Sequence, residues 1–260
     1  MIFDIARGTV RAALFSLTIL ALTSRPSWAK SAGDYAIDAR DYALAPLHWT
    51  ERDWQWAAGA AAAVATAYSF DGRTRDHFVS GSVPAGTDPH QWRDAAPIAA
   101  LTVGTLAVGL LRHDTESTRS GANMLEAVAL GGLSSIVLKT VTGRERPNET
   151  ADRSQFRSGG DGFPSAHVTM AFAAAQVFAD SMPREQWGWR ALGYGLAAAT
   201  AYARLDSNVH WGSDIVAGAS LGIATGRFVS GRGATSSKRV SMWLVPLDHG
   251  ALLTVNVNQP

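Results

Sequence analysis

Small and apolar residues form long runs along most of the chain, and short polar stretches separate these runs. Six runs are rich in Ala, which has a high helix propensity, and in Gly, which lets neighbouring helices approach closely. The pattern predicts an all-α core of short helices, each of roughly fifteen to eighteen residues. We expect these helices at 54–70, 95–111, 122–139, 166–181, 189–203 and 213–229.

The N-terminal segment, residues 1–29, is interpreted as a cleaved secretory signal peptide. Arg7 and Arg11 precede an apolar stretch at 12–22, and the sequence Ser-Trp-Ala at 27–29 offers a cleavage site. The apolar stretch has about eleven residues, which is too short to span a bilayer comfortably. An uncleaved membrane anchor is the alternative.

The remaining segments flank a helical core that we assign to residues 54–230. Residues 30–53 are mixed in character, and we expect a short helix at 35–44 that lies on the core. Residues 231–260 change to a polar linker followed by β-branched, apolar stretches, which favours a small β-hairpin over an unstructured tail. We expect its strands at 240–246 and 251–257.

Composition removes several classes of function. The chain has 260 residues, of which 47% are hydrophobic, so one compact domain with a sizeable core is expected. A formal net charge of +1 provides no field for a polyanion, so no nucleic-acid partner is expected. The chain contains no cysteine, and its seven histidines lack metal-ligand spacing, so we expect neither a metal nor another cofactor.

Candidate chemistry is concentrated where the last two helical runs meet, around Arg204, His210 and Asp214. His210 and Asp214 are four residues apart and would share one face of a helix. A carboxylate in that position can hold the proton on one ring nitrogen and leave the other nitrogen as a nucleophile. Arg204 offers a planar fork for an oxyanion such as phosphate. Taken alone, the stretch fits a buried Arg–Asp pair with a core histidine equally well.

Two further polar stretches favour the functional interpretation. Residues 139–147 read KTVTGRERP and contain Lys139 and Arg146, and residues 164–167 read PSAH. In order and spacing, the three stretches resemble the signatures K-x6-RP, PSGH and SR-x5-H-x3-D of the type-two phosphatidic acid phosphatase and vanadium haloperoxidase superfamily. Ala166 replaces the usual Gly, and Ala203 replaces the usual Ser.

The resemblance implies a six-helix core bundle and metal-independent hydrolysis of phosphate monoesters or pyrophosphates through a phosphohistidine. His210 would be the nucleophile, Asp214 would support its ring, and His167 would act as general acid and then as general base. The expected phosphate-binding residues are Lys139, Arg146, Arg204, Ser165 and Ala166. Arg144 lies off the family spacing, so we expect it to be solvated or adjacent to the substrate.

The substrate would be a phosphorylated lipid or a small phosphoester, with the apolar helices favouring lipid. The alternatives are a vanadate-dependent haloperoxidase and a non-catalytic helical protein that binds membranes or lipids.

Because the apolar runs are short, we expect a periplasmic domain that is soluble or associated with the membrane surface. The alternative is an integral inner-membrane protein, with 95–111 as its best span. Four tryptophans are expected at the end away from the site, as an interfacial belt or as caps on the core: Trp54, Trp56, Trp187 and Trp189.

Overall fold

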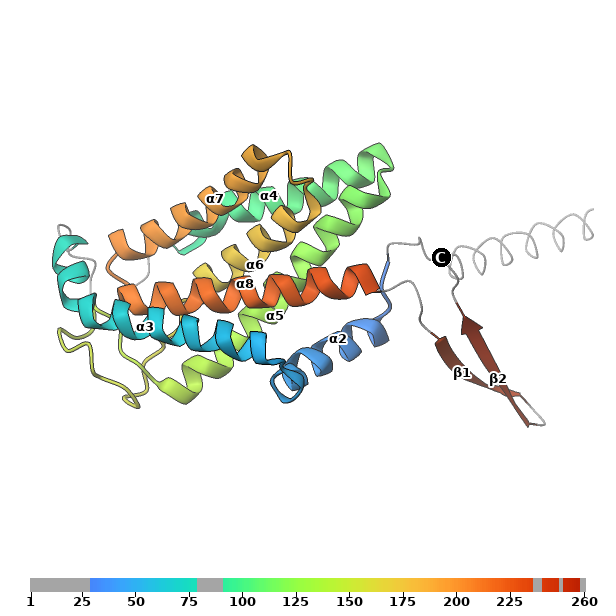
Figure 1. Cartoon of the computed structure of the whole chain (residues 1–260), viewed down its shortest axis with the longest axis horizontal. Coiled ribbons are helices and arrows are strands. Elements are labelled where there is room, and N and C mark those ends of the chain that lie inside the picture. The colour runs from blue at the N-terminus through green and yellow to red at the C-terminus, as the bar shows by residue number, and fades with distance from the viewer. Residues whose placement is uncertain (1–28, 79–90, 236–239, 248–249, 258–260) are drawn as a thin grey trace, which may run out of the picture.

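The computed structural model describes residues 29–78, 91–235, 240–247 and 250–257, so the signal-peptide prediction lies outside the described residues. The described helical part is all-α, as predicted (Figure 1). Its elements are α2 (Ala32–Leu44), η1 (Ala45–His48), α3 (Glu51–Phe78), α4 (Gln91–Arg112), α5 (Thr115–Thr142), α6 (Ala166–Ser181), α7 (Trp187–Asp206) and α8 (Gly212–Thr235).

Helices α3 to α8 cover the six predicted runs, but the predicted lengths are wrong for five of them. Only α6, with 16 residues, has the expected length, whereas α3 and α5 have 28 residues each. The difference arises because polar turns extend these helices beyond their apolar parts. Helix α3 continues through Arg75 and His77, and α5 begins with a turn that contains Glu116 and is capped by the side chain of Asp114.

Helix α6 lies at the centre of the described bundle and packs against α4, α5, α7 and α8. Its buried face is made largely of alanines, so the neighbouring backbones come close. A Cβ atom added to Gly222 of α8 would lie 2.4 Å from the carbonyl oxygen of Thr169 in α6, so a larger residue has no room there. The small residues of the sequence pattern therefore serve close helix packing.

The direction of the helices brings three connections to one end of the bundle. Helices α3, α5 and α7 end there, and α4, α6 and α8 begin there; this is the left end in Figure 1. The residues of all three signature stretches consequently lie at this end, although 75 positions separate Lys139 from Asp214 in the sequence. We call it the site end, and we call the opposite end, where α2 lies, the far end.

Helix α2 covers the predicted helix at 35–44 and is tied to the core by buried polar contacts. Asp38 is fully buried and accepts hydrogen bonds from Lys30 at 2.9 Å and from Arg232 of α8 at 2.7 Å. The hydroxyl groups of Tyr42 and Thr225 lie 2.6 Å apart. At the other terminus of the described chain, β1 (Val240–Leu247) and β2 (Gly250–Val257) pair in antiparallel register.

Candidate active site

His210 lies in the tight turn between α7 and α8, which Asn208 allows by adopting a left-handed conformation with φ of 52°. The residue is 3% exposed, and Nδ1 of its ring lies 3.5 Å from Oδ2 of Asp214 in the first turn of α8. The same oxygen accepts the backbone N–H of Trp211 at 2.9 Å. Among the described residues Nδ1 has no hydrogen-bond partner, so the His–Asp contact is close but not yet hydrogen-bonded.

Cationic groups from three separate segments surround this imidazole. The pKa of His210 lies well below its ordinary value, first because the ring is buried and then because of the positive charges near it. These charges belong to Lys139, Arg204, Arg146 and His167. The environment therefore favours a neutral ring with a free lone pair, which is the form that a nucleophile requires.

Lys139 and Arg146 are both held by Asp161, a residue that the sequence did not single out. Lys139, near the end of α5, donates its ammonium hydrogen bond to the carbonyl oxygen of Asp161. Arg146 donates from Nε and Nη2 to the two carboxylate oxygens of Asp161, at 2.7 and 2.9 Å. Burial alone would raise the pKa of Asp161, but the hydrogen bonds and charge of Arg146 lower it below the ordinary value.

Arg204 is fully buried in the last turn of α7, where it forms an ion pair with Asp94 of α4 at 3.1 Å. Asp94 is fixed in turn because its carbonyl oxygen accepts the hydroxyl of Thr200 at 3.0 Å. Sequence reasoning placed Asp94 in a polar loop and missed this role. The missed signal is a lone carboxylate directly before an apolar helical run.

The start of α6 adds neutral donors to the cluster. Ser165 is fully buried at the N-cap position, but its side chain makes no capping bond, and its Oγ has no partner among the described residues. Its backbone N–H donates to the carbonyl oxygen of Asp214 at 3.1 Å, which ties α6 to α8. Ala166 and His167 form the first turn, whose backbone N–H groups suit an anion. Ala166 is helical, so the position does not need the glycine that the family has there.

The expectation that Arg144 is solvated is wrong. Gly143 ends α5 in a left-handed conformation with φ of 52°, and the chain then turns inward, so Arg144 is fully buried. Its guanidinium donates to Oδ1 of Asp214 at 2.6 Å, to Oγ of Ser213 at 2.7 Å and to Oδ2 of Asp71 at 2.8 Å. Arg144 thus bonds one oxygen of Asp214, Oδ1, while the other oxygen, Oδ2, faces His210.

Asp214 itself has an unusual acidity. Burial raises its pKa to about 7, although the charge and hydrogen bonds of Arg144 and the N–H of Trp211 oppose this shift. A buried histidine, a carboxyl group of perturbed pKa and several cations in one cluster are typical of a functional site. Within the described ranges, no group of three or more His, Asp or Glu side chains is arranged to hold a metal ion.

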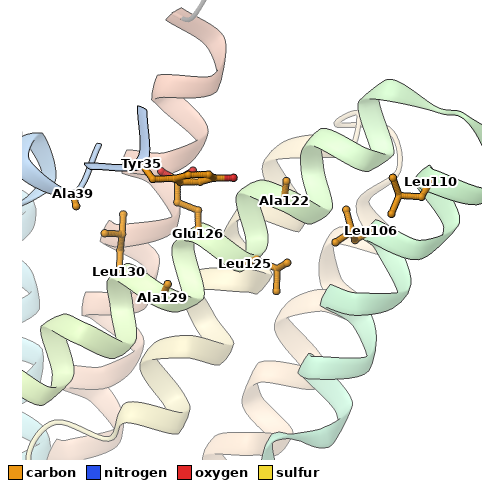
Figure 2. A pocket seen from close by; sticks show the side chains of 9 residues that line it. All are labelled: Tyr35, Ala39, Leu106, Leu110, Ala122, Leu125, Glu126, Ala129 and Leu130. Carbon is orange, nitrogen blue, oxygen red and sulfur yellow. The ribbon is translucent and has the colours of Figure 1, made fainter. Parts of the chain in front are cut away.

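A pocket of about 540 Å³ lies elsewhere, between α2, α4 and α5, and no residue of the three signatures lines it (Figure 2). Its walls are apolar apart from Glu126 and Tyr35. The lining residues are Tyr35, Ala39, Leu106, Leu110, Ala122, Leu125, Glu126, Ala129 and Leu130.

Comparison with known proteins agrees with the signatures. Residues 120–235 match the model of the PAP2 superfamily, and this range contains every residue predicted for the site. This range, which is less than half of the chain, is thus similar to the PAP2 superfamily, the class of proteins that the three signature stretches resemble.

One curated relative and two solved structures are similar to parts of the chain. The lipid A 1-phosphatase of Porphyromonas gingivalis is 38% identical over 85 residues, which is 32% of this chain and only 17% of that protein's length. The crystal structure of Aquifex aeolicus LpxE covers 55% of this chain and 87% of its own, with 21% identity and a TM-score of 0.40. The first transmembrane PAP2 type phosphatidylglycerolphosphate phosphatase from Bacillus subtilis covers 66% and 96%, with 18% identity and a TM-score of 0.35.

Proposed function

We propose that the protein is a phosphatase that hydrolyses phosphate monoesters or pyrophosphates of lipids through a phosphohistidine. The observation that carries this proposal is the buried His210, whose pKa is lowered by burial and by four cationic groups brought together from three signature stretches. A neutral imidazole surrounded by cations is suited to attack a phosphate group, which carries negative charge on its oxygens.

The reaction would proceed in two balanced steps. In the first, the ring nitrogen of His210 that faces the cations attacks phosphorus, and the bond from phosphorus to the leaving oxygen breaks. His167 donates a proton to that oxygen, and Asp214 stabilises the positive ring that forms. In the second step, His167 takes a proton from water, the hydroxide attacks phosphorus, and the phosphorus–nitrogen bond breaks to restore a neutral His210.

The remaining residues would hold the phosphoryl oxygens during both steps. Lys139, Arg146 and Arg204 supply positive charge where negative charge develops, and arginine adds paired donors in fork geometry. The hydroxyl of Ser165 is buried and lacks a partner among the described residues, which leaves it able to donate to a phosphate oxygen. The N-terminal turn of α6, which includes Ala166, adds backbone donors.

A lipid substrate is favoured by the outer surface of the molecule. Two helices, Arg93–Arg112 of α4 and Thr115–Thr142 of α5, are long and apolar enough to cross a membrane, and only 22% and 33% of their most apolar windows are buried. The exposed side chains on α5 include Leu133, Ile136 and Val137. Contiguous apolar surface of this kind is uncommon on a protein surrounded by water. The relative from P. gingivalis is named for a lipid substrate, which agrees with this preference.

We also propose that α4 and α5 contact the hydrocarbon of a membrane, in place of the periplasmic domain, soluble or associated with the membrane surface, that the short predicted helices favoured. That expectation rested on helix lengths that are too small for both helices. The tryptophans at the far end are exposed, as an interfacial belt requires: Trp54, Trp56, Trp187 and Trp189. If membranes that contain the protein are washed with alkaline carbonate, the protein should stay in the pellet; release into the supernatant would contradict this placement.

A substrate panel tests the activity directly. The purified protein should release phosphate from lipid phosphates in the presence of EDTA, and faster than from p-nitrophenyl phosphate. Rapid acid-free quenching during turnover should trap a phosphorylated protein that is stable to alkali and labile to acid, as expected for a phosphohistidine. A complete dependence of turnover on added metal, or the absence of any trapped phosphoprotein, would contradict the proposed mechanism.

A further inference from the structure

Next to the His–Asp pair lies a chain of three ionisable side chains that is fully enclosed by protein. Asp71, Arg144 and Asp214 are each 0% exposed, and Arg144 bridges the two carboxylates at 2.8 and 2.6 Å. We call these three residues the buried triad. Asp214 belongs to the signature stretch that contains His210, and Arg144 lies within the stretch 139–147. Asp71 comes from α3, outside the range that matches the PAP2 superfamily.

Asp71 also holds the start of α8 in place. Its carboxylate accepts the backbone N–H of Ser213 at 2.8 Å and the hydroxyl of Ser213 at 2.6 Å. The first N–H groups of a helix have no partner within the helix, so a carboxylate from α3 satisfies one of them across the bundle. Because Asp214 is the next residue, its position depends on this contact from another helix.

The charge of the buried triad bears on His210. When both carboxylates are ionised, the buried triad carries one net negative charge, whereas an isolated pair of Arg144 and Asp214 would be neutral. The charged groups that lower the pKa of His210 are all cationic and do not belong to the buried triad. They are Lys139 from α5, Arg204 from α7, Arg146 from the α5–α6 loop and His167 from α6. A positive ring on His210 therefore needs negative charge from the side of Asp214.

We propose that Asp71 is a positioning residue for the reaction, because it shares Arg144 with Asp214 and so leaves Asp214 with the net negative charge that a cationic His210 requires. The inference rests on the proposed role of His210 as nucleophile. Its geometry is specific: Arg144 bonds Oδ1 of Asp214, and Oδ2, the oxygen that faces His210, has only a backbone N–H as its hydrogen-bond donor among the described contacts.

The substitution Asp71→Asn tests the proposal, because it removes the charge and nearly keeps the shape. We expect kcat to fall about 10-fold to 100-fold, as is usual for a residue that acts through a catalytic neighbour, while KM changes much less. Asp71 also raises the pKa of Asp214 by repulsion between the two carboxylates. In D71N the acidic limb of the pH profile should therefore move to lower pH, which a purely structural loss would not cause.

Asp38→Asn is the matched control, because Asp38 is an equally buried carboxylate that pairs with two cations at the far end. D38N should keep the wild-type pH profile and kcat in its folded fraction. A folded D71N with wild-type kcat and an unmoved acidic limb would overturn the proposal. If D71N is not recovered in folded form, the charge-preserving Asp71→Glu decides: it must keep the wild-type acidic limb, and a limb moved to lower pH would overturn the proposal.

His210→Ala, measured in parallel, separates this inference from the function on which it rests. If H210A is active, the phosphohistidine mechanism itself fails. If H210A is inactive and D71N behaves like the wild type, only the role of Asp71 fails.

Discussion

The two ends of the bundle both bury charged side chains, yet they bury them in different ways. At the far end, Asp38 and Glu126 share the ammonium group of Lys30, and Asp38 also binds Arg232. These contacts join helices and leave the two carboxylates hydrogen-bonded to cations. A buried ion cluster of this kind fixes the position of α2, because its charged groups are paired with one another.

At the site end, by contrast, ion pairs surround groups that are left without partners. Nδ1 of His210 and Oγ of Ser165 are buried and make no hydrogen bond within the described residues. Leaving such groups unsatisfied costs free energy, and native proteins accept that cost mainly where function needs it. The comparison teaches that buried charge alone does not mark a site; cations gathered around an unsatisfied imidazole and hydroxyl do.

The largest expected effect is that of His210→Ala, which removes the proposed nucleophile. We expect kcat to fall by at least about 1,000-fold, since the covalent route is lost and only binding and charge stabilisation remain. The measurement is phosphate release from a lipid phosphate. His48→Ala is the control, because His48 is exposed in η1, at the far end of the bundle. If H210A keeps more than a tenth of the wild-type rate, the site end is no more important for activity than the far end, and the proposed nucleophile is wrong.

The next largest effect concerns arginine at each end. Arg204→Lys keeps the charge near Asp94 but loses the planar fork, so we expect kcat/KM to fall about 100-fold. Arg232→Lys makes the same change in the far-end cluster and should alter kcat/KM less than about twofold, because it affects only a structural pair. Equal losses in R204K and R232K would show that both act through stability, and a thermal unfolding curve of each variant would reveal this.

The pH profile gives a third test. Because burial raises the pKa of Asp214 to about 7, this group is largely protonated in more acidic solution and cannot then support a cationic His210. The pKa of His210 is lowered, so that ring stays neutral over the same range. We therefore expect kcat/KM to rise about tenfold per pH unit up to about 7 and then to level off. An acidic limb near pH 4, where an ordinary carboxyl group titrates, would contradict this assignment.

The smallest effect on catalysis is expected for Asp38→Asn. Removing one partner from a buried ion cluster should lower the free energy of unfolding by about 3 kcal/mol, while kcat per folded molecule stays within about twofold. Denaturant unfolding measures the first quantity, and activity normalised to folded protein measures the second. A large loss of kcat in D38N with little loss of stability would mean that the far end takes part in the reaction.

Much of the candidate site can be proposed from the sequence because its signature residues stand at short, fixed intervals. Fixed intervals within one stretch of sequence identify two pairs of candidate residues: His210 with Asp214, and Lys139 with Arg146. Their convergence follows from helix direction alone, because antiparallel helices return the chain to the same end.

The partners of these residues could not be predicted, because each comes from a distant element. Asp71 lies in the polar last part of α3, about two turns before its end, and Asp94 lies in the first turn of α4. In such polar parts, a helical residue is indistinguishable in sequence from a loop residue. For Arg144, the position off the family spacing favours a solvated or substrate-adjacent side chain. Its burial depends on carboxylates that are supplied more than 60 residues away in either direction. The predicted helix lengths were too short for a separate reason: the polar turns at the helix ends carry no apolar signal.

The position of Asp71 and Asp94 has a practical consequence for anyone who trims this chain. The range that matches the superfamily begins at residue 120, after both of these carboxylates. A fragment cut at that boundary would keep Arg144 and Arg204 but lose Asp71 and Asp94, two of their ion-pair partners. An interior cation stripped of its counter-ion is costly enough to unfold a small domain. We therefore expect that the segment matched by the superfamily model does not fold by itself and needs the two helices, α3 and α4, that carry these carboxylates.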